Sequence, residues 1–489
     1  MKREPLFGLV KSLNQTEKTY FRKHAKRFSS GSLNYIQLFE LIEKQNKYDE
    51  AILKIEVGKK YFSQYKKHLY EKLKEALRAY HSSNSVQAQL RNCICDFEIL
   101  QAKGLHMAAR KSLVRAKKIA IKNQLLPELV TLGKYEAILI KEEDNLQQLS
   151  QHFDNYQKSA LQVNNQIKQT IDIEELHMAI VKWNKKIEWV RNEVEKNQLM
   201  EILDSPKLKI KLENYEAESQ RLYINAIGYY FLGAFEDSLN YFKEQREIVE
   251  FIDDFNVVRC FANNALLSLF TKNDSFVAEF SGLQIFKSSS KNATEYQSIL
   301  LVLLKLIELV QRQEFETACG LIRAKQEEIE KLKHIVDTKH AMYNEFTLMS
   351  FYSVAAYLGN REPKKALQRI NYFLNNAQKD LKQDTYGIAR VLNLCIHMEL
   401  GNWDLLEYEY EATYNHLKSK NRINLFEKAT LEFVNAMNNN VAYKQKLSAI
   451  TKYKDDLVKL TKVKFENVVF SFFDFKKWVE RYEIIISTE

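Results

Sequence analysis

A few short patterns in this chain bring together residue types that could do chemistry. Glu174-Glu-Leu-His177 supplies one Glu-x-x-His pair, which a helix would present on one face. A carboxylate-bridged di-iron centre in a helical bundle needs two such pairs and two further glutamates, so a single pair does not predict a metal site. The acidic pairs Asp253-Asp254 and Asp455-Asp456 fall at predicted helix ends, where capping or solvation accounts for them.

Other signatures of catalysis are missing from the sequence. It contains no Cys-x-x-Cys, no His-Glu-x-x-His, no Gly-rich phosphate loop and no Gly-x-Ser-x-Gly. The ten histidines are scattered along the chain. A catalytic triad assembled from distant positions would leave no local pattern. On the patterns that are present, we expect a non-enzymatic protein with no catalytic, cofactor-binding or metal-binding residues.

One cluster has a clear chemical character, and it is basic. Along a predicted helix from about His106 to Asn123, four cations recur at i, i+4, i+7 and i+11. This basic row consists of Lys111, Arg115, Lys118 and Lys122. It lies about 200° around the helix from a stripe of alanine and leucine, so it should face solvent. The row could bind a polyanion such as nucleic acid; the alternative is a solvated face that only aids solubility.

The charge is unevenly distributed along the chain. The net charge is +10, and residues 1–126 contain 26 Lys and Arg against 11 Asp and Glu. The remainder contains 47 against 52, so the basic end is the front end. This asymmetry permits an acidic or polyanionic partner there.

The elements that position these residues are predicted to be helices. With 12 Gly and 4 Pro in 489 residues, the chain lacks the turn residues that many short strands need, which predicts an all-α protein. A hydrophobic content of 45% excludes wholesale disorder. Five scattered cysteines indicate small core residues in a reducing compartment. No stretch is long and apolar enough to span a membrane, so we expect a soluble, cytoplasmic protein.

One segment anchors the organisation of the chain. From Leu222 to Gln245, apolar residues recur at helical spacing before Gly233 and again after it, which predicts two helices joined by a turn. The signature positions of the pair are Leu222, Asn225, Ala226, Tyr229, Ser238 and Phe242. The segment resembles one tetratricopeptide repeat. A single hairpin cannot bury both faces, so the resemblance implies an α-solenoid of degenerate tetratricopeptide-like (TPR-like) helical hairpins with an N-terminal helical cap unit.

Weaker copies of the pattern extend in both directions. Turns are predicted at Gly104, Asn273 and Gly401, and Ala318 falls at the small position of a second helix. The distances between Gly104, Gly233 and Gly401 fit three and four units of about 42 residues, longer than the standard repeat. In its length, its degenerate repeats and its Phe473-Asp-Phe…Trp478 ending, the chain also resembles uncharacterised bacterial helical-repeat proteins.

Other segments complete the predicted organisation. Asn14-Gln-Thr-Glu17 is a capping-box pattern that starts a helix. Asp49 to Ile55, a turn at Gly58 and a following basic helix faintly resemble a helix-turn-helix, with an amphipathic cap as the alternative. We expect a turn between Gln162 and Thr170 and an aromatic-rich helix from Val468 to Tyr482. We also expect one long helix from Glu175 to Leu203, which packs within the chain and braces the solenoid or, as the alternative, pairs two copies as a homodimer.

These segments predict four regions. They are a basic N-terminal helical unit (1–85), degenerate repeats ending in a long helix (86–206), TPR-like repeats (207–442) and a C-terminal helical cap (443–489).

The resemblance implies a function in binding. Tetratricopeptide-like solenoids typically bind a peptide or helix on the concave face of their first helices, so the favoured function is a protein-protein interaction scaffold. The frame places on that face Tyr223, Ile227, Tyr230 and Phe231 in the anchor repeat, and Val391 and Met398 in the last clear repeat. The alternative is a nucleic-acid-binding or regulatory protein that uses the basic N-terminal region, with the solenoid as sensor or dimerisation arm.

Overall fold

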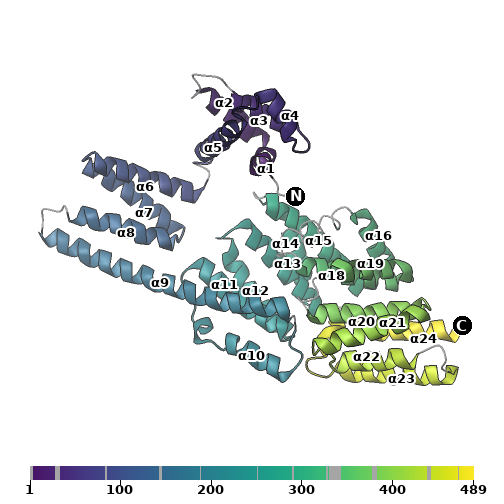
Figure 1. The fold of residues 1–489 in the computed structure, drawn as a ribbon. Helices are drawn as coiled ribbons and strands as arrows, with labels where there is room; N and C mark the ends of the chain where they lie inside the picture. Colours follow the sequence, from purple (N-terminus) through teal and green to yellow (C-terminus); the bar gives the residue numbers. More distant parts are fainter. Residues whose placement is uncertain are drawn as a thin grey trace. The chain divides into compact units, whose positions relative to one another are not determined.

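The protein is described by a computed structural model. The residues that the structure describes are 4–27, 34–82, 85–141, 146–187, 189–250, 252–288, 291–326, 329, 343–376, 383–437, 442–471 and 473–488. All of their regular structure is helical, which confirms the all-α class. The chain divides into two compact units, unit 1 (Met1–Ile167) and unit 2 (Lys168–Glu489), with the boundary inside one long helix (Figure 1).

Unit 1 contains eight complete described helices and the first part of a ninth. Their bounds are α1 Pro5–Ser12, α2 Gln15–Arg27, α3 Asn34–Lys44, α4 Glu50–Val57, α5 Phe62–Tyr80, α6 Val86–Ala102, α7 His106–Lys122, α8 Leu126–Ile140 and α9 Leu146–Lys186. Two separate apolar clusters hold them: α1 to α5 close around residues such as Phe39 and Leu69, and α6 to α8 around Phe97 and Ala116. Neighbouring helices therefore pack locally.

Two local patterns in unit 1 fold as predicted. Glu17 donates its backbone N–H to Asn14 Oδ1 at 2.9 Å, and Asn14 donates its N–H to Glu17 Oε2 at 2.9 Å, so the capping box at the start of α2 is confirmed. The short helix α4 starts at an Asp49 cap and ends at Gly58, which has a φ of 99°. Gly104, with a φ of 73°, joins α6 to α7.

Unit 2 is built from pairs of helices that pack against the next pair along the chain. Beyond the end of α9, its described elements are α10 Glu193–Leu203, η1 Pro206–Lys209, α11 Tyr215–Phe231, α12 Phe235–Val249, α13 Asp254–Phe270, α14 Phe276–Ile285, α15 Lys291–Gln311, α16 Phe315–Ala324, α18 Tyr343–Gly359, α19 Pro363–Asn376, α20 Gln383–Glu399, α21 Trp403–Ser419, α22 Leu425–Ala436, α23 Tyr443–Leu460, η3 Asn467–Ser471 and α24 Phe475–Thr488.

Five helix pairs of unit 2 share one turn conformation. The second residue after the first helix of each pair has a positive φ, and these residues are Gly233, Lys272, Gln313, Arg361 and Gly401. They are spaced 39, 41, 48 and 40 residues apart, close to the predicted 42. In each turn the next residue donates its N–H to the carbonyl five positions earlier, as in Ala234 to Tyr229 at 3.0 Å. This bond satisfies a carbonyl that the helix end leaves open.

Small buried residues let the paired helices approach. Ser238 in α12 is fully buried and donates its hydroxyl to the carbonyl of Ala226 at 2.7 Å. Ala318 in α16 and Ala366 in α19 are fully buried at the matching place in their helices. The prediction that Ala318 occupies a small, covered position is therefore confirmed.

The region before α11 differs from the prediction. No turn interrupts residues 162–170, because α9 is continuous from Leu146 to Lys186. The expected single helix from Glu175 to Leu203 is wrong, since the chain leaves the helix near Ile187 and α10 restarts at Glu193. The expected three helical hairpins between Gly104 and Gly233 are not all present, because α9 alone fills 41 residues, about one predicted unit, without a turn. The four predicted region boundaries remain predictions.

Two smaller corrections concern the ends of helices. The expected helix from Val468 to Tyr482 is split into η3 and α24, and Asp474 Oδ1 caps α24 by accepting the N–H of Lys477 at 3.1 Å. Phe472, within that expected helix, lies outside the described residues. Asp253 caps α13 as expected, whereas Asp455 and Asp456 lie inside α23. The described helices include none that is long and apolar enough to cross a membrane.

Candidate functional site

A small apolar groove opens on the first helices of three successive pairs in unit 2. Its walls come mainly from α11, α13 and α15, with contributions from α9, α12 and α18. The lining residues are Asn184, Ile227, Tyr230, Phe231, Phe242, Ala262, Asn263, Leu266, Leu267, Leu300, Leu303, Leu304, Glu345 and Leu348. The structure thus brings together three of the four residues predicted from the anchor repeat. We call this surface the apolar groove.

The volume of the apolar groove limits what it can hold. Its volume is about 90 Å³, well below the roughly 300–1,000 Å³ of pockets for small organic ligands. A void of this size accepts one or two apolar side chains. The groove is therefore the size of an anchor position in a recognition surface.

Polar groups are few in the lining of the apolar groove. Glu345 Oε1 accepts the hydroxyl of Tyr296 at 2.6 Å. Burial of Tyr296 and the neighbouring carboxylate raise the pKa of that hydroxyl well above its usual value, so it remains a donor to Glu345. Asn184 and Asn263 supply the amide groups of the lining. The arrangement offers apolar contact with a few hydrogen-bonding groups, and no nucleophile.

The fourth predicted residue of the anchor repeat lies one helical turn away. The ring of Tyr223 packs edge-on against His177, with centroids 5.7 Å apart, and the guanidinium of Arg259 lies 4.7 Å from its centroid. Burial, with the charge of Arg259, lowers the pKa of His177 below its usual value. Tyr223 and His177 thus belong to an internal contact beside the groove.

Val391 and Met398 are placed differently from the anchor-repeat residues. Their side chains are 0% and 2% exposed, because α19, α21 and α22 pack around α20. The first helix of this pair therefore presents no open surface at either residue, and the apolar groove does not extend to them.

The basic row on α7 in unit 1 is exposed along its whole length. Lys111, Arg115, Lys118 and Lys122 are all exposed, while Ala109, Leu113, Ala116 and Ala120 on the opposite stripe are buried. Within the described residues none of the four forms an ion pair, whereas their neighbour Lys117 binds Glu136 at 2.6 Å. Three apolar side chains, Met107, Val114 and Ile121, are also exposed on α7.

Metal-ligating side chains do not cluster in the described part of the chain. No group of three or more His, Cys, Asp or Glu side chains there is arranged to hold a metal ion. Four cysteines are buried, and burial raises the pKa of Cys260 to about 12 and that of Cys319 to about 11, so these thiols stay protonated. Cys95 is exposed, which corrects the expectation that all five are core residues.

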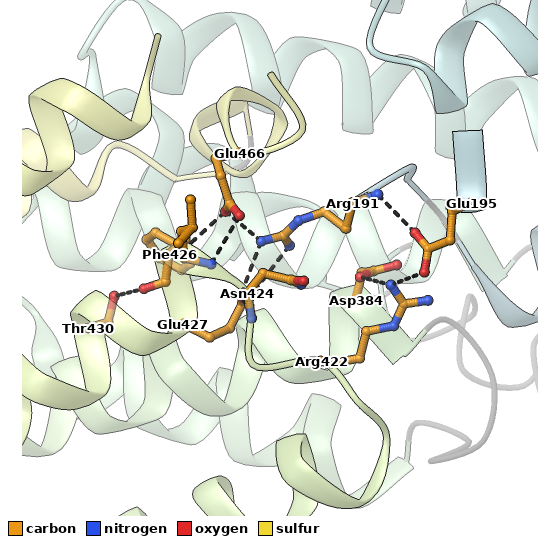
Figure 2. Close-up of polar contacts among 10 residues, drawn as sticks. Arg191, Glu195, Asp384, Arg422, Asn424, Phe426, Glu427, Thr430 and Glu466 are labelled. Carbon is orange, nitrogen blue, oxygen red and sulfur yellow. Dashed lines mark hydrogen bonds and ion pairs between the residues drawn. The ribbon is translucent and has the colours of Figure 1, made fainter. Parts of the chain in front are cut away.

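A cluster of buried charged side chains lies at the non-helical segment that connects α9 to α10. The guanidinium of Arg191 donates to both oxygens of Glu427 at 3.1 and 3.0 Å and to Glu466 Oε2 at 2.7 Å (Figure 2). The three side chains are 0%, 3% and 4% exposed. Glu466 also accepts the N–H groups of Leu425 and Phe426 at 3.1 and 3.2 Å, at the first residues of α22.

A second ion pair adjoins the first (Figure 2). Arg422, in the loop before α22, contacts Glu195 of α10 at 2.8 Å and Asp384 of α20 at 3.3 Å. Glu195 in turn accepts the N–H of Arg191 at 2.9 Å. We call the six side chains Arg191, Glu195, Asp384, Arg422, Glu427 and Glu466 the charge cluster. The charge cluster links the segment between α9 and α10 to helices that follow some two hundred residues later in the sequence.

Burial sets the electrostatics of the charge cluster. Burial raises the pKa of Glu427, and the charge of Arg191 opposes part of that rise. For Arg191, burial lowers the pKa, but the carboxylates of Glu427 and Glu466 outweigh it, so the net shift is upward. Because solvent scarcely reaches these groups, the cluster is suited to holding helices together and not to acid-base catalysis on a substrate.

Comparison with models of known protein families, with curated proteins and with solved structures found no match.

The sequence carried one overlooked signal for the charge cluster. Asn192-Glu-Val-Glu195 repeats the Asn-x-x-Glu pattern of Asn14 and Glu17, and Asn192 Oδ1 accepts the N–H of Glu195 at 2.9 Å as the cap of α10. The pattern marks a helix start inside the segment that we expected to be one helix. The same pattern at Asn424 and Glu427 forms a capping box for α22.

Proposed function

We propose that the protein is a non-enzymatic interaction scaffold and that the helix pairs of unit 2 form a TPR-like solenoid. The proposal rests on one observation: the apolar groove draws its walls from three successive first helices and contains Ile227, Tyr230 and Phe231. The recurrence of one turn conformation at about 42-residue intervals supports the solenoid. The partner is a peptide or helix that inserts one apolar anchor side chain.

The chemistry of the apolar groove narrows the partner. Leucine and aromatic walls favour a leucine, methionine or phenylalanine anchor, whose burial contributes about 1.5–3 kcal/mol. Glu345 and the two asparagines favour hydrogen-bond donors beside the anchor. Lys, Asn and Arg at the positions that clamp a C-terminal carboxylate are replaced here by apolar and aromatic residues, so a chain-terminal carboxylate is disfavoured.

Site-specific photo-crosslinking in the full chain tests this function. A photoreactive phenylalanine at Asn263 should crosslink a partner in the cells that make the protein, and Leu266→Glu should reduce that product about tenfold or more, since it places a charge in the anchor pocket. The matched control is the same crosslinker at Val277, which is 64% exposed on α14. Equal products from both positions, or a product indifferent to Leu266→Glu, would refute the proposal.

A second candidate function is supported by the basic row. Four exposed cations without ion-pair partners in the described chain form a row on α7 that fits the phosphates of nucleic acid. Filter binding or fluorescence anisotropy with a labelled duplex and a labelled single strand tests it. Binding that survives replacement of all four by Glu would exclude the row as the site.

A further inference from the structure

A second, larger pocket in unit 2 shares no lining residue with the apolar groove. It has a volume of about 620 Å³, within the roughly 300–1,000 Å³ of sites for small organic ligands. It lies between the C-terminal ends of α13, α15 and α18 on one side and residues of η3 and α24 on the other. We call it the C-terminal pocket.

Aromatic side chains dominate the apolar part of the C-terminal pocket. They are Phe270, Phe315, Tyr352, Phe470, Phe473 and Trp478. Gly359 lets one of them approach, because a Cβ there would collide with the ring of Phe315. Trp478 is held by donating its Nε1–H to Glu399 Oε2 at 3.1 Å and by stacking on Tyr482 with centroids 5.4 Å apart. These contacts fix the buried Trp478 in the wall of the pocket, and the half-buried rings of Phe270, Phe315 and Phe470 are the flat surfaces on which a planar ring can stack.

Cations surround this aromatic lining. Lys272, Arg361, Lys477 and Arg481 line the pocket, with Asp474 as the carboxylate of the lining. Lys477 lies 3.7 Å from Asp474 and Arg481 lies 3.1 Å from Glu399, so those two charges are partly balanced. Lys272 and Arg361 are exposed and form no ion pair within the described residues. The pocket therefore offers two uncompensated positive charges beside aromatic rings.

These two cations stand at left-handed turn positions. Lys272, Gln313 and Arg361 are the positive-φ residues of three successive turns, with φ of 52°, 64° and 58°, and all three line the pocket. The equivalent residues on either side, Gly233 and Gly401, are glycines and do not line it. Left-handed backbone is unfavourable for a residue with a side chain. Long polar side chains thus occupy this strained position at the three turns that reach the pocket.

We propose that the C-terminal pocket binds a small organic anion with a planar aromatic ring system and a phosphate, sulfonate or carboxylate group. The ring stacks among the aromatic residues, and the anionic group lies between Lys272 and Arg361, where charge-assisted hydrogen bonds are strongest. This ligand class follows from the pocket alone and does not depend on the peptide-binding function of the apolar groove.

A pair of fluorescent probes tests the proposal with the full chain. Anilinonaphthalene sulfonate carries an aromatic body and an anionic group, and N-phenylnaphthylamine is its neutral relative. The folded protein should bind the sulfonate at one site, about tenfold or more tighter than the neutral probe, because only the sulfonate meets the two cations. Equal affinity for both probes would overturn the anionic part of the proposal.

The decisive variant is the double substitution Lys272→Gly and Arg361→Gly. It removes both side chains and leaves residues that favour the observed backbone, so the variant should melt at a higher temperature while its affinity for the sulfonate falls about tenfold or more. Affinity for the neutral probe should be unchanged. Unchanged sulfonate binding in this more stable variant would overturn the assignment.

Two controls separate this pocket from other sites. Asn421→Gly changes another positive-φ residue, φ 54°, that does not line the pocket, and should leave the affinity for the sulfonate as it is. Leu266→Glu alters the apolar groove and should also leave it unchanged. Loss of sulfonate binding in Leu266→Glu alone would place the probe in the groove and refute the proposed site.

Discussion

Removal of the Arg191 guanidinium is the sharpest test of what holds unit 2 together. In Arg191→Leu, two carboxylates that are 3% and 4% exposed lose the cation between them. Three charge-assisted hydrogen bonds disappear, each of which contributes roughly 1.5–3 kcal/mol in isolation. Breaking a buried ion pair from one side costs about 3–5 kcal/mol in all, because the remaining charges stay buried.

Because some contacts of the two carboxylates remain, we expect Arg191→Leu to lower the free energy of unfolding by about 4 kcal/mol. Glu466 keeps the N–H groups of Leu425 and Phe426, and Glu427 keeps the N–H of Asn424 at 3.1 Å, so neither carboxylate is left without a donor. For a unit of this length, the unfolding entropy converts that loss into a fall in the midpoint temperature of roughly 6 °C.

Tryptophan fluorescence during thermal and urea unfolding measures this loss of stability in unit 2. The four tryptophans, Trp183, Trp189, Trp403 and Trp478, all belong to unit 2, so their emission does not report on unit 1. The matched control is Arg312→Leu. Arg312 is 59% exposed, and its partner Glu308 keeps an ion pair with Lys305, so the control should change stability by less than about 1 kcal/mol.

The pH dependence of the same variant checks the cause. Burial raises the pKa of Glu427 even with Arg191 present, and loss of the cation raises it further. A carboxyl whose pKa is higher in the folded state binds protons on folding, so its contribution to stability is lost as pH rises above the unfolded value near 4.5. The difference in free energy of unfolding between wild type and Arg191→Leu should therefore be larger at pH 7.5 than at pH 5. A loss no greater than that of Arg312→Leu, or a gap that does not narrow in acid, would refute the reasoning.

Three further outcomes are expected. If the basic row binds nucleic acid through four phosphates, affinity should fall roughly a hundredfold between 50 and 200 mM salt and vanish when all four cations are reversed to Glu, with helicity by circular dichroism unchanged. Ala318→Arg should destabilise unit 2 by roughly 3 kcal/mol or more in urea titrations, whereas Thr317→Arg on the exposed neighbour should be nearly silent; equal midpoints would contradict the small position at Ala318. Gly359→Ala should destabilise by roughly 1–3 kcal/mol because its Cβ meets Phe315, while Gly320→Ala, with open space around it, should stabilise slightly; the same sign for both would exclude the close contact.

Local signals in the sequence were sufficient for much of the fold. The turn at Gly233 and the capping box at Asn14 depend on residues within a few positions of one another, and both form as predicted. The break after α9 was missed because Trp183, Ile187 and Val190 continue the spacing of one helical face across it. What stabilises the break is Arg191, whose partners Glu427 and Glu466 follow more than two hundred residues later. A short stretch of sequence never contains both partners of that interaction, so local patterns could not predict it.

The same distinction explains the mixed outcome for the predicted binding residues. Ile227, Tyr230 and Phe231 line one groove, since their positions on α11 follow from helical periodicity, and their role in binding stays a prediction. Whether such a surface stays open depends on what packs against it. At Val391 and Met398 the surrounding helices cover the corresponding face of α20, and that covering is decided by elements outside the repeat itself.

The turns of unit 2 connect sequence, stability and the proposed pocket. Placing repeat turns at glycines identifies Gly233 and Gly401. It does not identify the left-handed residues of the three turns between them, because these are Lys272, Gln313 and Arg361. A left-handed residue with a side chain costs roughly 1–2 kcal/mol, and the intrinsic cost of glycine offsets only part of that difference. Stability alone would therefore favour glycine at all five turns. The three exceptions line the C-terminal pocket, so their side chains are placed to contact a ligand there. Gln124 and Asn421 have the same left-handed conformation at turns that do not line it.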